Sequence, residues 1–177
     1  METIIQALRN PVSTGAIAQS STGLAQMMVD CAKVTKTKRV IEIGPGTGVI
    51  TQQILKKSKH VHAIEINETF AKQLKGCKVT IGSAEKLTEY TKPVDCIISG
   101  LPWSIFPGSV QETILHQIKL SLKPKGTFVT FAYYPLHMLP NAQAFKRRLE
   151  QKFHVERSPI VWGNLPPAFV YICTIQQ

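Results

Sequence analysis

The fold of this chain is decided by the stretch Arg39-Val40-Ile41-Glu42-Ile43-Gly44-Pro45-Gly46-Thr47-Gly48-Val49-Ile50-Thr51. It opens with a short β-branched run bounded by glycine, which is typical of a buried parallel strand. Glycines then stand at alternate positions, and the apolar residues after them are spaced like one face of a helix. The stretch therefore predicts a strand, a glycine loop and a helix, the first part of a βαβ unit. Because glycine lacks the Cβ that would keep a ligand off the backbone, we expect a ligand against the loop.

The spacing of the three loop glycines distinguishes this motif from two other nucleotide-binding motifs. Gly44, Gly46 and Gly48 read G-x-G-x-G, whereas a dinucleotide fingerprint has its third glycine one residue later. No lysine follows the glycines, as it does in a phosphate-binding P-loop. The loop resembles motif I of class I methyltransferases, which bind S-adenosyl-L-methionine. From the loop alone, a tight turn that binds no ligand remains the alternative.

The order of the expected elements extends this resemblance over nearly the whole chain. Strands are expected at 40–43, 60–64, 77–81, 94–98, 127–132, 155–162 and 168–175. Helices alternate with the first five strands, and a turn at 123–126 precedes the fifth. This pattern fits an α/β fold of the Rossmann-like class I methyltransferase type, a seven-stranded, mostly parallel sheet with helices on both faces. We expect one domain over residues 1–177, with residues 1–35 as an N-terminal helical cap.

Two carboxylates are expected near the cofactor. Glu42 lies one residue from the end of the first strand, where its carboxylate would brace loop amides or face the cofactor's ammonium group. Glu65 ends the second strand about 20 residues after the first glycine, where a doubly wound fold places an acid on a ribose. Its two oxygens can accept hydrogen bonds from both ribose hydroxyls, and Ile66 beside it is assigned to the same site. A solvated acid at a strand end is the alternative for Glu65.

A third cofactor contact is expected where the third strand ends, at Gly82-Ser83-Ala84. In the family that the glycine loop resembles, this corner usually reads Gly-Asp-Ala, and the aspartate binds the adenine amine. Ser83 replaces that aspartate here. Because a serine oxygen is uncharged and on a shorter side chain, we expect the adenine contact to be weaker, or to pass through water or backbone. Ala84 and Ser99, the latter at the end of the fourth strand, are also assigned to the cofactor.

The acceptor pocket is expected in the segment that follows the fourth strand, because ligands of open α/β sheets bind beyond the carboxyl ends of strands. Gly100, Leu101, Pro102 and Trp103 begin this segment. We expect the carbonyl groups of Gly100 and Leu101 to orient an amine. Tyr133, after the fifth strand, is assigned to the same pocket. A turn carrying core aromatics is the alternative.

A methylated cation can be held over aromatic faces. The candidate aromatic residues are Trp103, Phe106, Tyr133, Tyr134 and Trp162. For each of them taken singly, core packing is the alternative. No general base is obvious, because Asp95 precedes a buried strand and the five histidines are scattered.

Composition limits the partners and the compartment. The 177 residues include 21 Lys+Arg and 11 Asp+Glu, so the formal net charge is +10. That charge favours an anionic membrane surface or nucleic acid, although it also serves solubility alone. No apolar run approaches the ~20 residues of a membrane-spanning helix, and no secretory signal is visible. The four cysteines lack zinc spacing, so we expect no metal site and buried thiols in a cytoplasmic protein, peripheral on the inner membrane face.

Several segments resemble bacterial phospholipid N-methyltransferases more specifically. The first is the entry loop Thr14-Gly15-Ala16-Ile17, followed by Ser20-Ser21 and a helix that begins near Leu24-Ala25. Gln19 departs from the proline that is usual before the serine pair. The other matching segments are Ser99–Pro102, Tyr134-Pro135 and Asn164–Val170.

Ribosomal RNA adenine dimethylases share the Ile-Gly-Pro-Gly-Thr-Gly loop and are the competing resemblance. Their fourth motif usually reads Asn-Leu-Pro-Tyr, and its asparagine helps to hold the target amine. This chain has Gly100 at that position and Trp103 in place of the tyrosine. Those enzymes also commonly grip RNA with a C-terminal helical domain, whereas this chain stops at its last expected strand.

The resemblance implies an S-adenosyl-L-methionine-dependent N-methyltransferase. We expect its acceptor to be the amine of phosphatidylethanolamine at an anionic membrane surface. Direct transfer needs a neutral amine in line with the donor methyl group, so the protein mainly supplies position and desolvation. An RNA adenine methyltransferase is the second hypothesis. A cofactor-binding module without catalysis is the third, because Ser83 stands where the family has aspartate.

Overall fold

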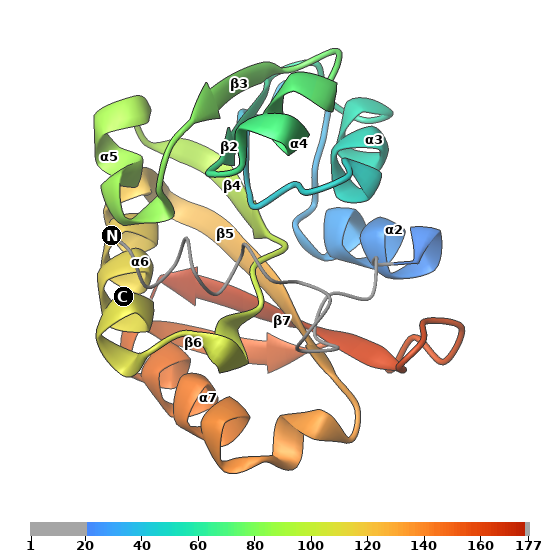
Figure 1. Ribbon diagram of the computed structural model, residues 1–177, viewed down its shortest axis with the longest axis vertical. Helices are drawn as coiled ribbons and strands as arrows, with labels where there is room; N and C mark the ends of the chain where they lie inside the picture. Colours follow the sequence, from blue (N-terminus) through green and yellow to red (C-terminus); the bar gives the residue numbers. More distant parts are fainter. Residues whose placement is uncertain (1–20, 176–177) are drawn as a thin grey trace.

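A computed structural model describes residues 21–175 and has one mixed sheet at its centre (Figure 1). The strands are β1 (Val40–Ile43), β2 (Val61–Glu65), β3 (Lys78–Ile81), β4 (Val94–Ser99), β5 (Leu122–Tyr133), β6 (Phe153–Arg157) and β7 (Ala168–Ile175). They lie in the order β3-β2-β1-β4-β5-β7-β6. Neighbours from β3 to β5 pair in parallel, and β7 runs antiparallel to both β5 and β6. The predicted seven-stranded, mostly parallel sheet is thereby confirmed.

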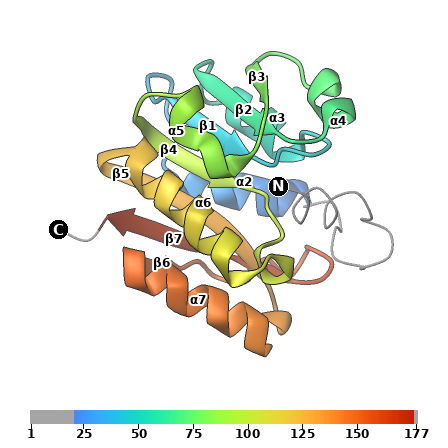
Figure 2. The same ribbon diagram turned by 60° about the vertical axis from the view of Figure 1, so that its left-hand side comes forward.

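Helices cover both faces of this sheet (Figure 2). The α-helices are α2 (Thr22–Cys31), α3 (Val49–Leu55), α4 (Glu68–Gln73), α5 (Leu87–Tyr90), α6 (Gly108–Ser121) and α7 (Pro140–Lys152). Three 3-10 turns are η1 (Ala84–Lys86), η2 (Trp103–Ile105) and η3 (Leu136–Met138). One face packs against α5, α6 and α7, and the other packs against α2 and α3. The long helices α2 and α6 each bury an apolar stripe along one side.

The strand order places a topological switch point at the centre of the sheet. Strand β1 pairs with β2 on one side and with β4 on the other. All four of its residues are buried, as expected for a strand covered on both faces. The loops that follow β1 and β4 leave the same edge of the sheet in opposite directions. That divergence opens the crevice in which doubly wound folds bind ligands.

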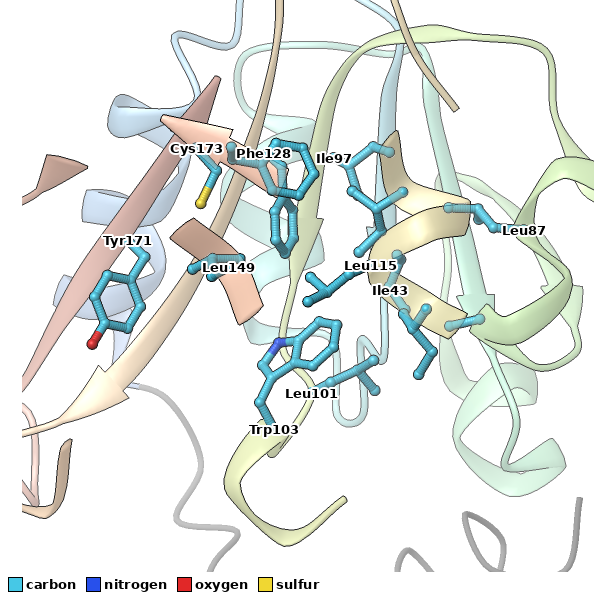
Figure 3. Close-up of a cluster of buried hydrophobic side chains, with 14 of the residues drawn as sticks. Ile43, Leu87, Ile97, Leu101, Trp103, Leu115, Phe128, Leu149, Tyr171 and Cys173 are labelled. Carbon is cyan, nitrogen blue, oxygen red and sulfur yellow. The ribbon is translucent and has the colours of Figure 1, made fainter. Parts of the chain in front are cut away.

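Two hydrophobic clusters hold the layers together. Figure 3 shows part of the larger cluster, in which Trp103, Phe128 and Leu149 meet between the sheet and the helices α6 and α7. The second cluster joins α2 and α3 to the opposite face, with Leu24 and Met28 fully buried. Burial of this apolar surface is the main favourable term in folding.

Helix α2 begins where the sequence predicts it. The Ser21 hydroxyl oxygen accepts a hydrogen bond of 3.2 Å from the backbone N–H of Leu24, so Ser21 is its N-cap. Met27 and Cys31 are partly buried against the core. The rest of the predicted entry segment, including the motif at 14–17, lies outside the described residues.

Two boundaries differ from the expectation. Strand β5 starts at Leu122 and includes the predicted turn at 123–126, where Lys125 has a positive φ of 93°. Its pairing with β4 shifts register between Val94 and Cys96. Residues 123–126 therefore form an irregular part of the strand and not the expected turn. Strand β6 ends at Arg157 instead of running on to Trp162, and only an isolated bridge from Val161 to Ala168 continues the pairing.

Three features bear on the expectations about membranes, metals and thiols. No helix within residues 21–175 is long and apolar enough to cross a bilayer. In the same part of the chain, no three His, Cys, Asp or Glu side chains converge as metal ligands would. Cys96 and Cys173 are buried free thiols as predicted, whereas Cys31 and Cys77 are only partly buried.

Candidate functional site

A pocket of about 370 Å³ opens at the carboxyl ends of the parallel strands. Its cofactor side is formed by the loops after β1, β2 and β3, and its other side by the segments after β4 and β5. Eleven of the residues assigned from sequence line it, namely Gly44, Gly46, Glu65, Ile66, Ser83, Ala84, Gly100, Leu101, Pro102, Trp103 and Tyr133. The three that are not among its described lining residues are Glu42, Gly48 and Ser99. The fold therefore brings together assigned residues as far apart in sequence as Gly44 and Tyr133.

Glu65 fixes the shape of the glycine loop. Its Oε2 accepts a hydrogen bond of 3.1 Å from the backbone N–H of Gly46, and its Oε1 accepts one of 2.8 Å from that of Asn67. Each carboxylate oxygen has a second lone pair, so both remain able to accept a ribose hydroxyl. Gly46 has a φ of +52°, and a Cβ there would meet no atom within 4 Å, so the loop backbone lies open to the pocket.

Glu42 has a different position from Glu65. It is fully buried behind the loop, where its Oε2 accepts a 2.6 Å hydrogen bond from the Thr51 hydroxyl of α3. Its Oε1 is buried without a partner among the described residues. Burial, assisted by the nearby charge of Glu65, raises the pKa of Glu42 to about 8. From the sequence, Glu42 is expected either to accept hydrogen bonds from the loop amides or to face the cofactor's ammonium group. In the structure, Glu65 accepts the hydrogen bond from the loop amide of Gly46.

The corner after β3 places Ser83 at the pocket with its hydroxyl already engaged. Ser83 Oγ accepts a hydrogen bond of 3.3 Å from the backbone N–H of Glu85 and donates one of 3.1 Å to the Glu85 carboxylate. It is thus the N-cap of η1, which begins at Ala84. One lone pair of the hydroxyl oxygen remains for an adenine amine, which agrees with the weaker contact expected from its chemistry.

The segment after β4 is held very close to the glycine loop. The Gly100 N–H donates a 2.9 Å hydrogen bond to the Ile43 carbonyl oxygen. A Cβ added at Gly100 would lie 2.7 Å from the Gly44 carbonyl oxygen, so no larger residue fits without movement. Ser99 supports the turn from inside, because its Oγ accepts a 3.2 Å hydrogen bond from the Leu101 N–H. Ser99 therefore shapes the pocket without lining it.

The five candidate aromatic residues divide into three groups. Trp103 and Phe106 are buried core residues: the Trp103 ring stacks on Phe145 at 4.7 Å, and its indole N–H donates a 3.0 Å hydrogen bond to Thr130 Oγ1. Tyr133 lines the pocket, and burial raises the pKa of its hydroxyl. Tyr134 and Trp162 are exposed outside the described pocket lining, with their rings 5.7 Å apart. Tyr133 is thus the best placed to face a cation.

His137 is a pocket residue that the sequence interpretation missed. It lies in η3, lines the pocket, and its Nδ1 is buried with no hydrogen-bond partner among the described residues. Burial and the charge of Arg157 lower its pKa, while a hydrogen bond to the backbone of Tyr133 opposes them. The imidazole is therefore neutral at pH 7 and able to accept a proton. Its proximity in sequence to Tyr134-Pro135 is the one signal that could have identified it.

Comparisons with known proteins identify the class of this chain. A family model described as ribosomal RNA adenine dimethylase matches residues 19–94. An ornithine lipid N-methyltransferase of Singulisphaera acidiphila is 28% identical over 93% of this chain and 90% of that protein. A TehB-like SAM-dependent methyltransferase from Corynebacterium glutamicum shares the fold, with a TM-score of 0.66, 17% identity, and coverage of 99% of this chain and 97% of that chain.

The chain is an S-adenosyl-L-methionine-dependent methyltransferase. The pocket of this methyltransferase fits its cofactor, since a glycine loop open to the pocket is followed by a carboxylate with free lone pairs for a ribose. A probable ribosomal RNA small subunit methyltransferase A of Pyrobaculum aerophilum is also similar, at 35% identity. The aligned region covers 45% of this chain and only 36% of the Pyrobaculum protein.

Proposed function

We propose that this methyltransferase transfers a methyl group to the primary amine of a membrane lipid, of the phosphatidylethanolamine or ornithine lipid class. The extent of the similarity supports this proposal best. The lipid enzyme is similar over nearly the full length of both chains. The ribosomal RNA family model stops at residue 94, before the segment that forms the acceptor side of the pocket. The match to the ribosomal RNA family model is thus confined to the half that holds the cofactor.

The lining of the acceptor side also supports a lipid amine. Its side chains are mostly apolar or aromatic, including Leu101, Phe131, Tyr133, Leu136 and Leu139. Glu65, on the cofactor side, is the one carboxylate among the described lining residues, and none of these is a lysine or arginine. An apolar pocket disfavours an ammonium ion relative to the neutral amine. The apolar lining therefore favours the deprotonated amine, which is the nucleophile.

The roles of the chain's own residues follow from this geometry. The bound cofactor supplies an electrophilic methyl group on a sulfonium. Glu65 and the glycine loop hold the cofactor, and the Gly100 and Leu101 segment orients the amine lone pair toward the methyl carbon. The Tyr133 ring stabilises the positive charge that the amine gains on methylation. The imidazole of His137, which lines the pocket, accepts the proton that the substrate ammonium must lose before it can act as nucleophile.

Replacing His137 with glutamine is expected to lower kcat for a lipid amine by about 10²-fold, the lower end of general-base effects. Because burial lowers the pKa of His137 below 6.5, the wild type should lose activity as pH falls through that lower value. The variant should lack this limb and keep only the rise in rate that follows deprotonation of the substrate amine itself, while its affinity for the cofactor stays the same. Rate profiles from pH 5 to 9, with cofactor binding measured by calorimetry, test this. A limb retained in the variant at the same pH as in the wild type would assign proton removal to another group.

Methyl-labelled cofactor offered with separate acceptors tests the proposed function. We expect label in phosphatidylethanolamine or in ornithine lipid within anionic vesicles, and none in unmodified ribosomal RNA. Label in RNA alone would overturn the proposal and give weight to the family model over residues 19–94. Cofactor binding without transfer to any of the three acceptors would also count against it, and would favour the non-catalytic hypothesis.

A further inference from the structure

Exposed apolar side chains gather beside the pocket entrance. Eight large apolar side chains are exposed among residues 21–175, and six of them lie in the two segments that follow β5 and β6. We call these six the apolar rim: Tyr134, Leu136, Met138, Leu139, Trp162 and Leu165. Figure 1 shows the β6–β7 loop reaching beyond the sheet. The two segments meet at the rings of Tyr134 and Trp162, which lie 5.7 Å apart. Grouped exposed apolar residues on a monomer mark an interaction surface.

The rim is held in a fixed shape. Asn164, between Trp162 and Leu165 in sequence, is itself buried. Its Oδ1 accepts a 2.8 Å hydrogen bond from the Ser21 N–H, and its Nδ2 donates one of 2.6 Å to the Pro166 carbonyl oxygen. The Tyr134 N–H donates a 2.7 Å hydrogen bond to the Pro167 carbonyl oxygen, which joins the two rim segments. A buried asparagine that secures a loop bearing Trp162 and Leu165 keeps their side chains in solvent. These hydrogen bonds thus fix the backbone in a conformation that exposes the rim side chains.

The rim is continuous with the pocket and lacks acidic residues. Leu136 and Leu139 belong to both, and Pro166 lines the pocket next to Leu165. No aspartate or glutamate occurs in residues 113–149 or 157–177. Basic residues border the rim instead: exposed Arg147 lies about two helical turns beyond the start of α7, and Lys146 beside it forms a 3.1 Å ion pair with Glu150. At the surface of an anionic bilayer, acyl chains lie beneath negatively charged headgroups. The uncharged apolar rim bordered by cations is complementary to this arrangement.

We infer that the apolar rim inserts into the surface of an anionic lipid bilayer and so places the pocket entrance at the level of the headgroups. Trp162 and Tyr134 have the amphipathic rings that favour this interface, and the bordering cations bind headgroup phosphates. A lipid amine can then enter the pocket while its acyl chains remain in the bilayer. The inference rests on the proposed lipid substrate. It adds that binding to the bilayer and binding of the amine use separate residues.

Two variants with a matched control test the inference. Leu165→Ser and Leu120→Ser remove the same side chain from exposed positions, 84% and 52% accessible, but Leu120 lies in α6 away from the rim. Leu165→Ser is expected to weaken binding to vesicles of phosphatidylethanolamine and phosphatidylglycerol, and the double variant Trp162→Ser/Leu165→Ser to weaken it at least 10-fold, as measured by co-sedimentation. Leu120→Ser should bind like the wild type. All variants should methylate a short-chain amine lipid, dispersed as monomers, at the wild-type rate.

The possible outcomes separate this inference from the proposed function. If the double variant binds vesicles like the wild type and still methylates the dispersed lipid, the inference that the apolar rim inserts into the bilayer is wrong. The proposed function is then unaffected. Vesicle binding that depends on the rim, without methylation of either lipid form, would support the surface and count against the function. A large loss of thermal stability in the double variant, or a loss of self-association, would show that protein covers the rim and would overturn the inference.

Discussion

Replacing Gly100 with alanine is expected to destabilise the protein by about 1–3 kcal/mol and to weaken cofactor binding at least 10-fold. The added Cβ would lie 2.7 Å from the Gly44 carbonyl oxygen, a backbone atom that cannot rotate away. Relief requires the loops after β1 and β4 to separate, which moves the amides that Glu65 holds in place. Thermal unfolding and calorimetric titration with the cofactor measure the two effects.

A glycine in open space provides the matched control for this variant. A Cβ at Gly163 would meet no atom within 4 Å, so Gly163→Ala should leave both measurements nearly unchanged. Gly100→Asn, which introduces the residue usual in ribosomal RNA adenine dimethylases, should be at least as damaging as alanine and should not create RNA methylation. Unchanged stability and affinity in Gly100→Ala would mean that the loops separate easily and that the close contact does not define the pocket.

The parts of the site that sequence could predict are those set by local spacing. The β-branched run, the glycine loop and Glu65 belong to one βαβ unit, so their relative positions follow from the geometry of adjacent parallel strands. The alternation of strands and helices likewise predicted the sheet that the structure confirms. Motif position also predicted that the segments after β3 and β4 meet the same pocket.

The parts that sequence could not predict depend on tertiary packing. Trp103 and Tyr133 looked equivalent as pocket aromatics, but one ring packs against Phe145 in the core and the other lines the pocket more openly. His137 lies on a short 3-10 turn without periodicity or a motif of its own. Glu42 and Glu65 both lie at or near the ends of buried strands, and only three-dimensional contacts show which carboxylate meets the loop amides.

Replacing Glu42 with glutamine is expected to remove most of the pH dependence of stability between about pH 4.5 and 8. In the folded protein the pKa of Glu42 is raised from 4.5 to about 8, chiefly by burial. Within that window the folded state keeps a proton that the unfolded state has released. The free energy of unfolding therefore falls as pH rises, by up to roughly 1.4 kcal/mol per pH unit. Its contribution is fully present below pH 4.5 and is lost as pH passes through about 8.

The Gln variant reproduces the shape of the neutral acid, because its amide oxygen can accept the Thr51 hydroxyl and its NH₂ occupies the place of the buried Oε1. Urea unfolding at several pH values should give a flatter curve for Glu42→Gln, which should exceed the wild type in stability above pH 8. Glu89→Gln, an exposed position on α5, should keep the wild-type slope. Parallel curves for Glu42→Gln and the wild type, together with weaker cofactor binding, would instead favour an ionised Glu42 facing the cofactor's ammonium group. The two measurements thus distinguish a neutral acid buried beneath the loop from a charged ligand of the cofactor.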